Sequence, residues 1–170
     1  MSFFFFHFVD SLEALGMESG AIADSQLTAS SELDSNHAIK RARLHTKETD
    51  VYSRGSWVSA TNDLNQWYQV DLGKITPVIH VSTQGRNFHS PAQMVTKYKL
   101  QFSDHGASFL FYKRQGESSE AVFDGNFDHD TIVYHQLNPP IRARYLRILP
   151  TAWQYYIAMR MEFYTYRADT

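Results

Sequence analysis

The feature that most constrains this fold is the recurrence of short segments in which apolar and polar residues alternate. In the segment WYQVDLG (67–73), Tyr68, Val70 and Leu72 fall on one face, and Gln69 and Asp71 fall on the other. A period of two is typical of a half-buried antiparallel strand. Eight segments, several of them alternating in this way, are predicted as strands: 67–73, 78–84, 97–103, 108–114, 121–125, 131–137, 144–150 and 158–166.

Turn residues separate these segments, and no long stretch carries a sustained helical period. Asp104 and Gly106 indicate a hairpin, and Gly73 indicates a turn between two strands. Pro139 and Pro140 are not expected inside a central strand. Many short strands with frequent turns predict an all-β, antiparallel sandwich or jelly roll. The polar region 32–60 is predicted as long loops, which are often functional.

Length and composition limit the classes of protein that remain. The chain has 170 residues, 43% of them hydrophobic, which is enough for one domain with a real core. A net charge of −2 gives no strong field for nucleic acid, so no nucleic-acid partner is expected. The absence of cysteine excludes disulfides and thiolate metal sites. No N-glycosylation sequon is present either.

The N-terminal stretch MSFFFFHFVD has an apolar run but does not fit a transmembrane segment, because it is far too short. No Lys or Arg precedes the run, and no small-residue cleavage site follows it. A secretory signal, an N-terminal strand, an apolar tail packed on the domain and a cloning artefact all remain open. We expect no transmembrane segment.

The sequence contains no complete motif for catalysis or metal binding among those considered. The segment DGNFDHD resembles the start of an EF-hand loop, but His129 replaces its glycine and His135 replaces its final glutamate. A polar turn between strands is therefore favoured. The chain contains no H-E-x-x-H, no G-x-S-x-G and no glycine-rich phosphate loop. We expect neither an enzyme nor a bound metal or cofactor.

Two further features have a structural and a functional interpretation. Lys40, Arg41 and Arg43 form a small basic cluster, for which a solvated loop is favoured over an anion site. Large rings are more often core residues than ligand platforms. Trp67 and Trp153 are predicted at the core or its edge, whereas Trp57 follows Gly55 in a loop and is predicted to be exposed.

A set of motifs in a fixed order resembles one known family. The motifs are LGMESGAIADSQLTASS (15–31), RARLH, NQWYQVDLGK, TQGR, KYKLQFSDHG, VFDGNFDHDT, PPIRARYLRILP and IAMRMEFY. Together they resemble the discoidin domain, also called the coagulation factor V/VIII type C domain. The resemblance implies an eight-stranded jelly roll over 15–166, preceded by an apolar extension (1–14) and followed by a short tail (167–170).

The resemblance also implies a ligand-binding end made of three loops and no catalysis. Its ligand residues are Leu33, Asp34, Asn36 and His37 in the first loop, Trp57 and Asn62 in the second, and Arg86, Phe88, His89 and Met94 in the third. Beneath these loops it implies a basic floor of Arg43 and Arg160 for an anionic headgroup.

Two ligand classes are compatible with these loops. A galactose-type or related sugar would use the planar fork of Arg86, aided by Asp34, Asn36 or His37. An anionic phospholipid membrane would instead take Leu33 and Phe88, and burying each is worth only about 1.5–3 kcal/mol. The polarity of the loops favours the sugar. A protein partner, including one on the cell surface, is a third possibility.

One departure from the family concerns the ends of the domain. Relatives usually join them by a disulfide, and Ser11 and Tyr166 occupy the corresponding places. The resemblance implies an extracellular or cell-surface protein, whereas the absence of cysteine and sequons leaves a cytoplasmic one open. A homo-oligomer is compatible with the sequence, because a single-site lectin gains avidity from multivalency.

Overall fold

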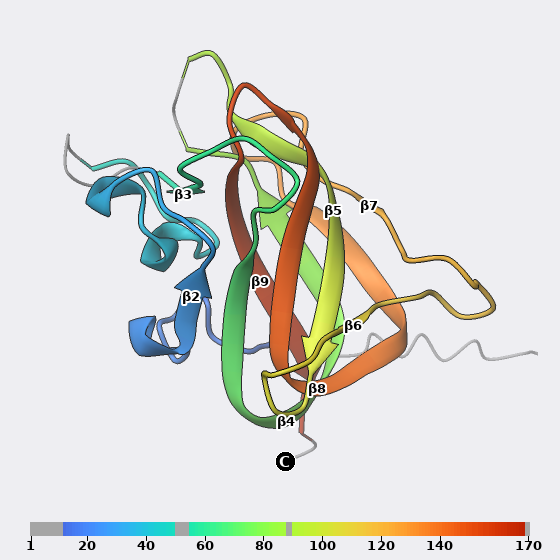
Figure 1. The fold of residues 1–170 in the computed structure, drawn as a ribbon. Helices are drawn as coiled ribbons and strands as arrows, with labels where there is room; N and C mark the ends of the chain where they lie inside the picture. Colours follow the sequence, from blue (N-terminus) through green and yellow to red (C-terminus); the bar gives the residue numbers. More distant parts are fainter. Residues whose placement is uncertain (1–11, 50–54, 88–89, 169–170) are drawn as a thin grey trace, which may run out of the picture.

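The computed structural model describes residues 12–49, 55–87 and 90–168, and these form an antiparallel β-sandwich (Figure 1). The hydrogen-bonded order is β1-β9-β4-β8-β5-β6, with β2 on β4, β3 on β9 and β7 on β5. The strands are β1 (Leu12–Ala14), β2 (Leu27–Ala29), β3 (Trp57–Val58), β4 (Tyr68–Gln84), β5 (Met94–Ser103), β6 (Leu110–Phe111), β7 (Phe123–Asp124), β8 (Val133–Gln154) and β9 (Ala158–Tyr166).

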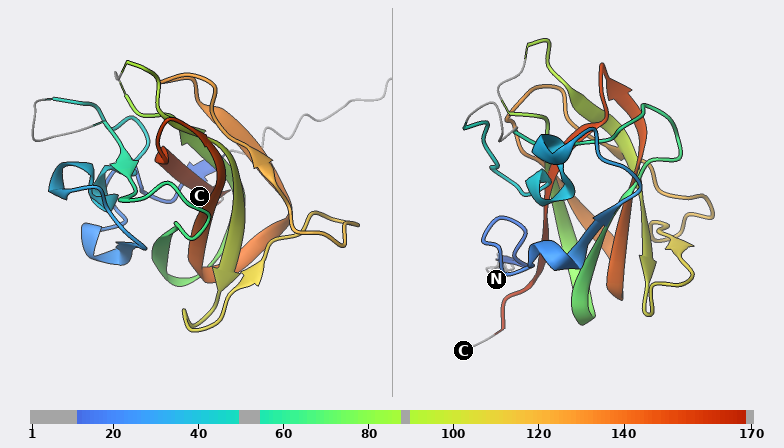
Figure 2. Two further views of the ribbon diagram at one scale, coloured as in Figure 1. Left: turned by 45° about the horizontal axis from the view of Figure 1, so that its top comes forward. Right: turned by 60° about the vertical axis from the view of Figure 1, so that its left-hand side comes forward.

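Helical structure in the described residues is limited to three single turns, all in the N-terminal third. These are the 3₁₀ turns η1 (Asp24–Gln26), η2 (Ser35–His37) and η3 (Ile39–Arg41). Figure 2 shows these segments gathered on one side of the sandwich. None of the helices in the described part of the chain is long and apolar enough to cross a membrane.

Two strands are much longer than predicted because each bends from one layer of the sandwich into the other. The pairing of β4 with β8 runs from Tyr68↔Ile148 to Asp71↔Tyr145 and resumes only at Thr76↔Ala143. Gly73 lies in this gap with φ 79°, a backbone conformation that suits glycine. The turn predicted there exists, but it joins segments 67–73 and 78–84 into one bent strand, β4.

Segments 131–137 and 144–150 are likewise joined, in β8, and this corrects the prediction for the prolines. Pro139 and Pro140 lie inside β8, but neither is paired with a residue of the neighbouring strands β4 and β5. The pairing with β4 jumps from Gln136↔His80 to Ile141↔Val78, so the prolines occupy a bulge. Two predicted strands shrink to β6 and β7, and short strands β1 to β3 are added, so the described residues form nine strands and not eight.

The core lies between the layers and is rich in aromatic rings. Tyr68 is completely buried and its hydroxyl donates to the sulfur of Met161 at 2.9 Å. Tyr98 stacks on Phe123 with ring centroids 5.3 Å apart. The apolar face predicted for 67–73 does point into this core, because Tyr68 and Val70 are both fully buried.

The two ends of the domain are tied together without a disulfide. β1 pairs with the end of β9 from Leu12↔Tyr166 to Ala14↔Tyr164, and residues 1–11 lie outside the described residues. Next to this pair, the buried carboxylate of Glu162 accepts hydrogen bonds from the backbone N–H groups of Met17 (3.0 Å) and Glu18 (2.9 Å). This carboxylate therefore anchors the N-terminal segment to β9.

We predict that Glu162→Gln destabilises the domain by about 1–3 kcal/mol, because the new amide places a donor against backbone donors. Urea unfolding of the two proteins measures the difference. Glu117→Gln, at an exposed site with a 3.8 Å contact to Arg114, serves as the control and should change stability by less than about 0.5 kcal/mol. Equal effects of the two substitutions would contradict the anchoring role.

Candidate ligand-binding site

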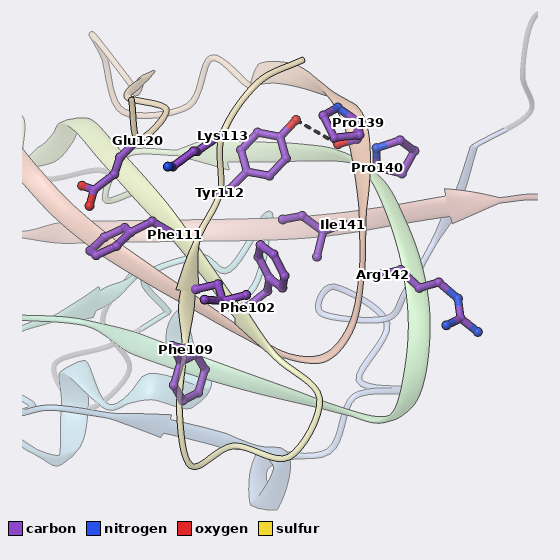
Figure 3. A pocket seen from close by; sticks show the side chains of 11 residues that line it. Phe102, Phe109, Phe111, Tyr112, Lys113, Glu120, Pro139, Pro140, Ile141 and Arg142 are labelled. Carbon is purple, nitrogen blue, oxygen red and sulfur yellow. Dashed lines mark hydrogen bonds between the residues drawn. The ribbon is translucent and has the colours of Figure 1, made fainter. Parts of the chain in front are cut away.

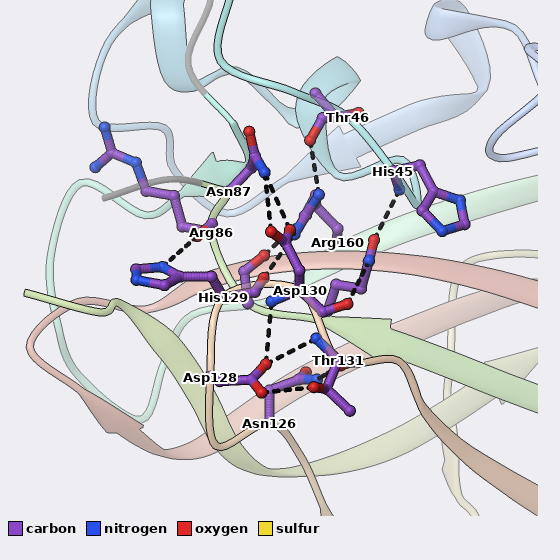
Figure 4. A network of polar contacts seen from close by, with 12 residues as sticks. His45, Thr46, Arg86, Asn87, Asn126, Asp128, His129, Asp130, Thr131 and Arg160 are labelled. Carbon is purple, nitrogen blue, oxygen red and sulfur yellow. Dashed lines mark hydrogen bonds and ion pairs between the residues drawn. The ribbon is translucent and has the colours of Figure 1, made fainter. Parts of the chain in front are cut away.

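The second and third predicted loops meet at one end of the sandwich around the buried side chain of Arg160 (Figure 4). Its Nε donates to the Gly85 carbonyl at 2.7 Å and its Nη1 to the Thr46 carbonyl at 2.7 Å. Its Nη2 donates to the His129 carbonyl (2.7 Å) and to Asp130 Oδ1 (2.8 Å). Arg160 thus joins the second loop, the third loop and the segment between β7 and β8.

Asp130 is the acidic partner in this network. Burial raises its pKa, but the hydrogen bonds from Arg160 and Asn87 outweigh that effect, so the net pKa lies below the usual value of 3.8. The Asn87 amide lies 3.0 Å from Asp130 Oδ1, and Gln84 Nε2 donates to the Asp130 carbonyl at 2.8 Å. The carboxylate is therefore held ionised against the arginine.

The third loop leaves β4 through Gly85, where no side chain fits. A Cβ at this position would lie 2.5 Å from the Asp128 carbonyl oxygen. The next residue, Arg86, is only 5% exposed, and its Nη1 donates to Gln93 Oε1 at 2.7 Å. Its Nη2 lies 3.8 Å from Glu48 Oε2, so the guanidinium is held in place by both flanks of the loop end.

In the first loop, Asp34 and His37 stabilise the loop itself. Asp34 Oδ1 caps η2 by accepting from the N–H of Asn36 (2.8 Å) and lies 2.7 Å from His37 Nδ1. The hydrogen bond from His37 lowers the pKa of Asp34, although burial acts in the opposite direction. Leu33 precedes this turn, is 42% exposed and faces solvent.

A hollow of about 250 Å³ opens at the loop end and is lined by Leu33, Arg86, Gln93 and Tyr156. It combines an aromatic ring and an aliphatic side chain with two planar polar groups. Leu33 and Arg86 were predicted as site residues. Gln93 and Tyr156 were not, although Gln93 lies inside the third loop and the pair Tyr155–Tyr156 interrupts the alternation between β8 and β9.

The turn that carries Tyr156 is strained and braced by Asn62. Tyr155 has φ 59°, an uncommon conformation for a bulky residue. The Asn62 side chain accepts from the Ile157 N–H at 2.9 Å and donates to the Tyr155 carbonyl at 3.3 Å. These bonds on either side of Tyr156 hold it at the hollow, so the structure gives Asn62 a bracing contact.

The prediction that Trp57 is exposed is wrong. Trp57 is fully buried, its ring meets Tyr68 edge-on at 5.3 Å, and its indole N–H donates to the Ser31 carbonyl at 3.1 Å. Met94, also assigned to the ligand surface, is fully buried at the start of β5. Both residues support the loops from inside, so a direct ligand contact would require them to move.

The basic floor also needs correction, because both arginines are engaged by the protein. Arg43 Nη1 donates to the carbonyls of Met17 (2.7 Å) and Ile22 (2.8 Å), and its Nη2 lies 2.6 Å from Asp24 Oδ1. Arg43 therefore points to the N-terminal segment, and Arg160 makes the four hydrogen bonds described above. Most of the N–H donors of each guanidinium are thus already used within the protein.

Two predicted residues, Phe88 and His89, lie outside the described residues. The acidic segment 124–130 forms a polar turn, as favoured from sequence. Asp128 accepts from the backbone N–H of Asp130 and Thr131, and Asp124 is paired with Lys97 at 2.6 Å. Within the described ranges, no group of three or more His, Asp or Glu side chains is arranged to hold a metal ion.

A family model described as the F5/8 type C domain matches residues 26–163. The chain belongs to this family. A human relative, EGF-like repeat and discoidin I-like domain-containing protein 3, is 40% identical over 156 residues. Coagulation factor V of the snake Pseudonaja textilis is 35% identical over 153 residues. The matches cover 88% of this chain but only 32% and 10% of those relatives.

Solved structures agree with this assignment. Discoidin II of Dictyostelium discoideum has a TM-score of 0.74 and 28% identity over 84% of this chain and 56% of that one. The family 32 carbohydrate-binding module of Clostridium perfringens NanJ, solved in complex with galactose, has a TM-score of 0.61. At 17% identity over 91% of this chain and 99% of that one, it shows the shared jelly-roll fold alone.

We predict that the Arg160–Asp130 pair makes the loop end sensitive to acid. Because the pKa of Asp130 is lowered on folding, its contribution to stability is present above 3.8 and is lost as the pH falls through the folded-state value. Asp130→Asn should therefore lower the melting temperature at about pH 7. At about pH 3 the difference in melting temperature between the variant and the wild type should be smaller.

Thermal melts at both pH values measure this, with Asp104→Asn as the control. Asp104 is exposed and makes no ion pair with any described residue. A pH-independent difference between wild type and Asp130→Asn would contradict the prediction.

Proposed function

We propose that this F5/8 type C domain is a non-enzymatic, lectin-like module that binds a galactose-type or related carbohydrate for adhesion or recognition outside the cell. The observation that carries the proposal is the hollow in which Tyr156 and Leu33 face Arg86 and Gln93. A sugar presents hydroxyls at its edge and a C–H surface on its face, so it needs both kinds of side chain.

The size of the hollow supports a small ligand. Its volume of about 250 Å³ lies just below the roughly 300–1,000 Å³ that is usual for drug-sized ligands. A single sugar residue is therefore a better match than a long oligosaccharide. Arg86 is held by Glu48 and Gln93, so its fork is oriented before a ligand arrives, which lowers the entropy cost of binding.

The relatives support the same ligand class without identifying the ligand. Discoidin II has a similar structure, and a more distant neighbour of the same fold was solved with galactose. Fold alone does not select a ligand, so the proposal depends on the side chains of the hollow.

A second candidate is peripheral binding to anionic phospholipid. Three exposed apolar side chains at the loop end favour it: Leu33 (42%), Tyr155 (60%) and Tyr156 (43%). The engagement of Arg43 and Arg160 by protein oxygens argues against it, because the headgroup would lack its basic floor. A protein partner at the same loops is the third candidate, and a homo-oligomer remains a proposal that would raise avidity.

Tyr156→Ala should weaken binding to a galactose-type glycan by about twofold to tenfold, because an aromatic contact of this kind is worth roughly 0.5–1.5 kcal/mol. A glycan array identifies the sugar, and calorimetry then measures the affinity. Tyr134→Ala is the matched control, since Tyr134 is 54% exposed on β8 and lies outside the hollow. Arg86→Gln should abolish hydrogen bonding to the sugar, and its melting temperature must be measured because Arg86 is buried.

Absence of binding to any glycan would refute the carbohydrate proposal, as would normal binding by Tyr156→Ala and Arg86→Gln. Phosphatidylserine liposomes test the second candidate in parallel. Binding that Leu33→Ser and Tyr155→Ser abolish would support the membrane instead of the sugar.

A further inference from the structure

A second hollow, of about 630 Å³, lies away from the ligand loops, where β5, β6 and the bulged part of β8 meet (Figure 3). Phe102 and Ile141 form its floor, and the segment from Phe109 to Lys113 forms one wall. The opposite wall is Pro139–Pro140, and Arg142 is at its end. β8 pairs with β4 here at Pro77↔Arg142, whereas the loop hollow lies beyond the far ends of these strands.

The lining of this groove, defined here by Phe102, residues 109–113, Glu120 and residues 139–142, is predominantly apolar and aromatic. Its two walls are fixed to each other, because the Tyr112 hydroxyl donates to the Pro139 carbonyl at 2.9 Å. Tyr112 is itself buried, so the groove is built on core side chains. Leu110, which also lines the groove, is 68% exposed.

Charge distinguishes this groove from an ordinary apolar depression. Lys113 and Arg142 are both exposed at its edge, and neither forms an ion pair with any described residue. The one acidic lining residue, Glu120, is neutralised by Lys99 at 2.6 Å. Two unneutralised cations therefore flank an apolar surface in a chain whose net charge is −2.

We propose that this groove binds a small amphiphilic anion, with an apolar body over Phe102, Phe111 and Ile141 and a carboxylate at Lys113, while Arg142 adds electrostatic attraction from the other end of the groove. Apolar sites with a few polar groups orient such ligands, because the head fixes the direction and the body supplies the buried area. A smaller hollow of about 260 Å³ shares Phe102, Leu110 and Arg142 with the groove and also contains Asp104. Asp104 repels an anion, which places the carboxylate on the Lys113 side.

Decanoate is a suitable probe, and 1-decanol is its uncharged counterpart. Titration of the full chain, followed by backbone amide NMR shifts, should show decanoate-dependent shifts at Leu110, Lys113 and Arg142. The combined variant Lys113→Gln/Arg142→Gln should weaken decanoate binding by about threefold to tenfold and leave decanol binding unchanged. A Lys40→Gln variant, at an exposed lysine outside the groove, should bind decanoate like wild type.

Leu110→Ser tests the apolar part and has a closely matched control in Leu64→Ser, because both leucines are 68% exposed. Of these two variants, only Leu110→Ser should weaken the binding of decanoate and of decanol, each by roughly fivefold. The proposal is overturned if decanoate gives no saturable shifts, if decanoate and decanol bind with equal affinity, or if the two leucine variants lose equal amounts of affinity. Shifts confined to the loop hollow would also overturn it.

Discussion

The buried guanidinium of Arg160 is the contact on which the ligand-binding end of the domain depends. It lies on β9, a strand of the sandwich, and it donates hydrogen bonds to residues of other segments: Thr46, Gly85, His129 and Asp130. Three of these acceptors are backbone carbonyls, so a single side chain satisfies backbone groups of three separate segments. The loops are thus positioned by the rigid β-structure beneath them.

This arrangement separates support from recognition. Arg160, Trp57 and Asn62 hold backbone in place, whereas Leu33 and Tyr156 present side chains at the surface of the hollow. Arg86 belongs to both groups, because Glu48 and Gln93 fix a guanidinium that still lines the hollow. A small polar molecule bound at such a hollow would require little rearrangement of the protein, which would favour its affinity.

The strands could be predicted from sequence because period-two alternation directly reports a half-buried surface, as Tyr68 and Val70 show. The bends in β4 and β8 could not, since a turn at Gly73 looks the same whether it joins two strands or bends one. The family resemblance predicted three loops at one end, but not which of their side chains are buried. Trp57 and Met94 are adjacent to polar residues in the chain, and only the packing of distant strands shows that they are buried. The roles of Arg43 and Arg160 depend on carbonyl groups that no residue-type pattern reveals.

The turn between β8 and β9 has a practical consequence. Asn62 holds it through the backbone of Tyr155 and Ile157, and uses no atom of the tyrosine side chains at 155 and 156. Position 156 can therefore accept many residues without loss of the turn, while the positive φ at 155 favours residues such as Asn, Asp or Gly over the tyrosine present there. A library varied at 156, with Leu33 as its partner, would offer a route to redirect the domain to new ligands on an unchanged scaffold.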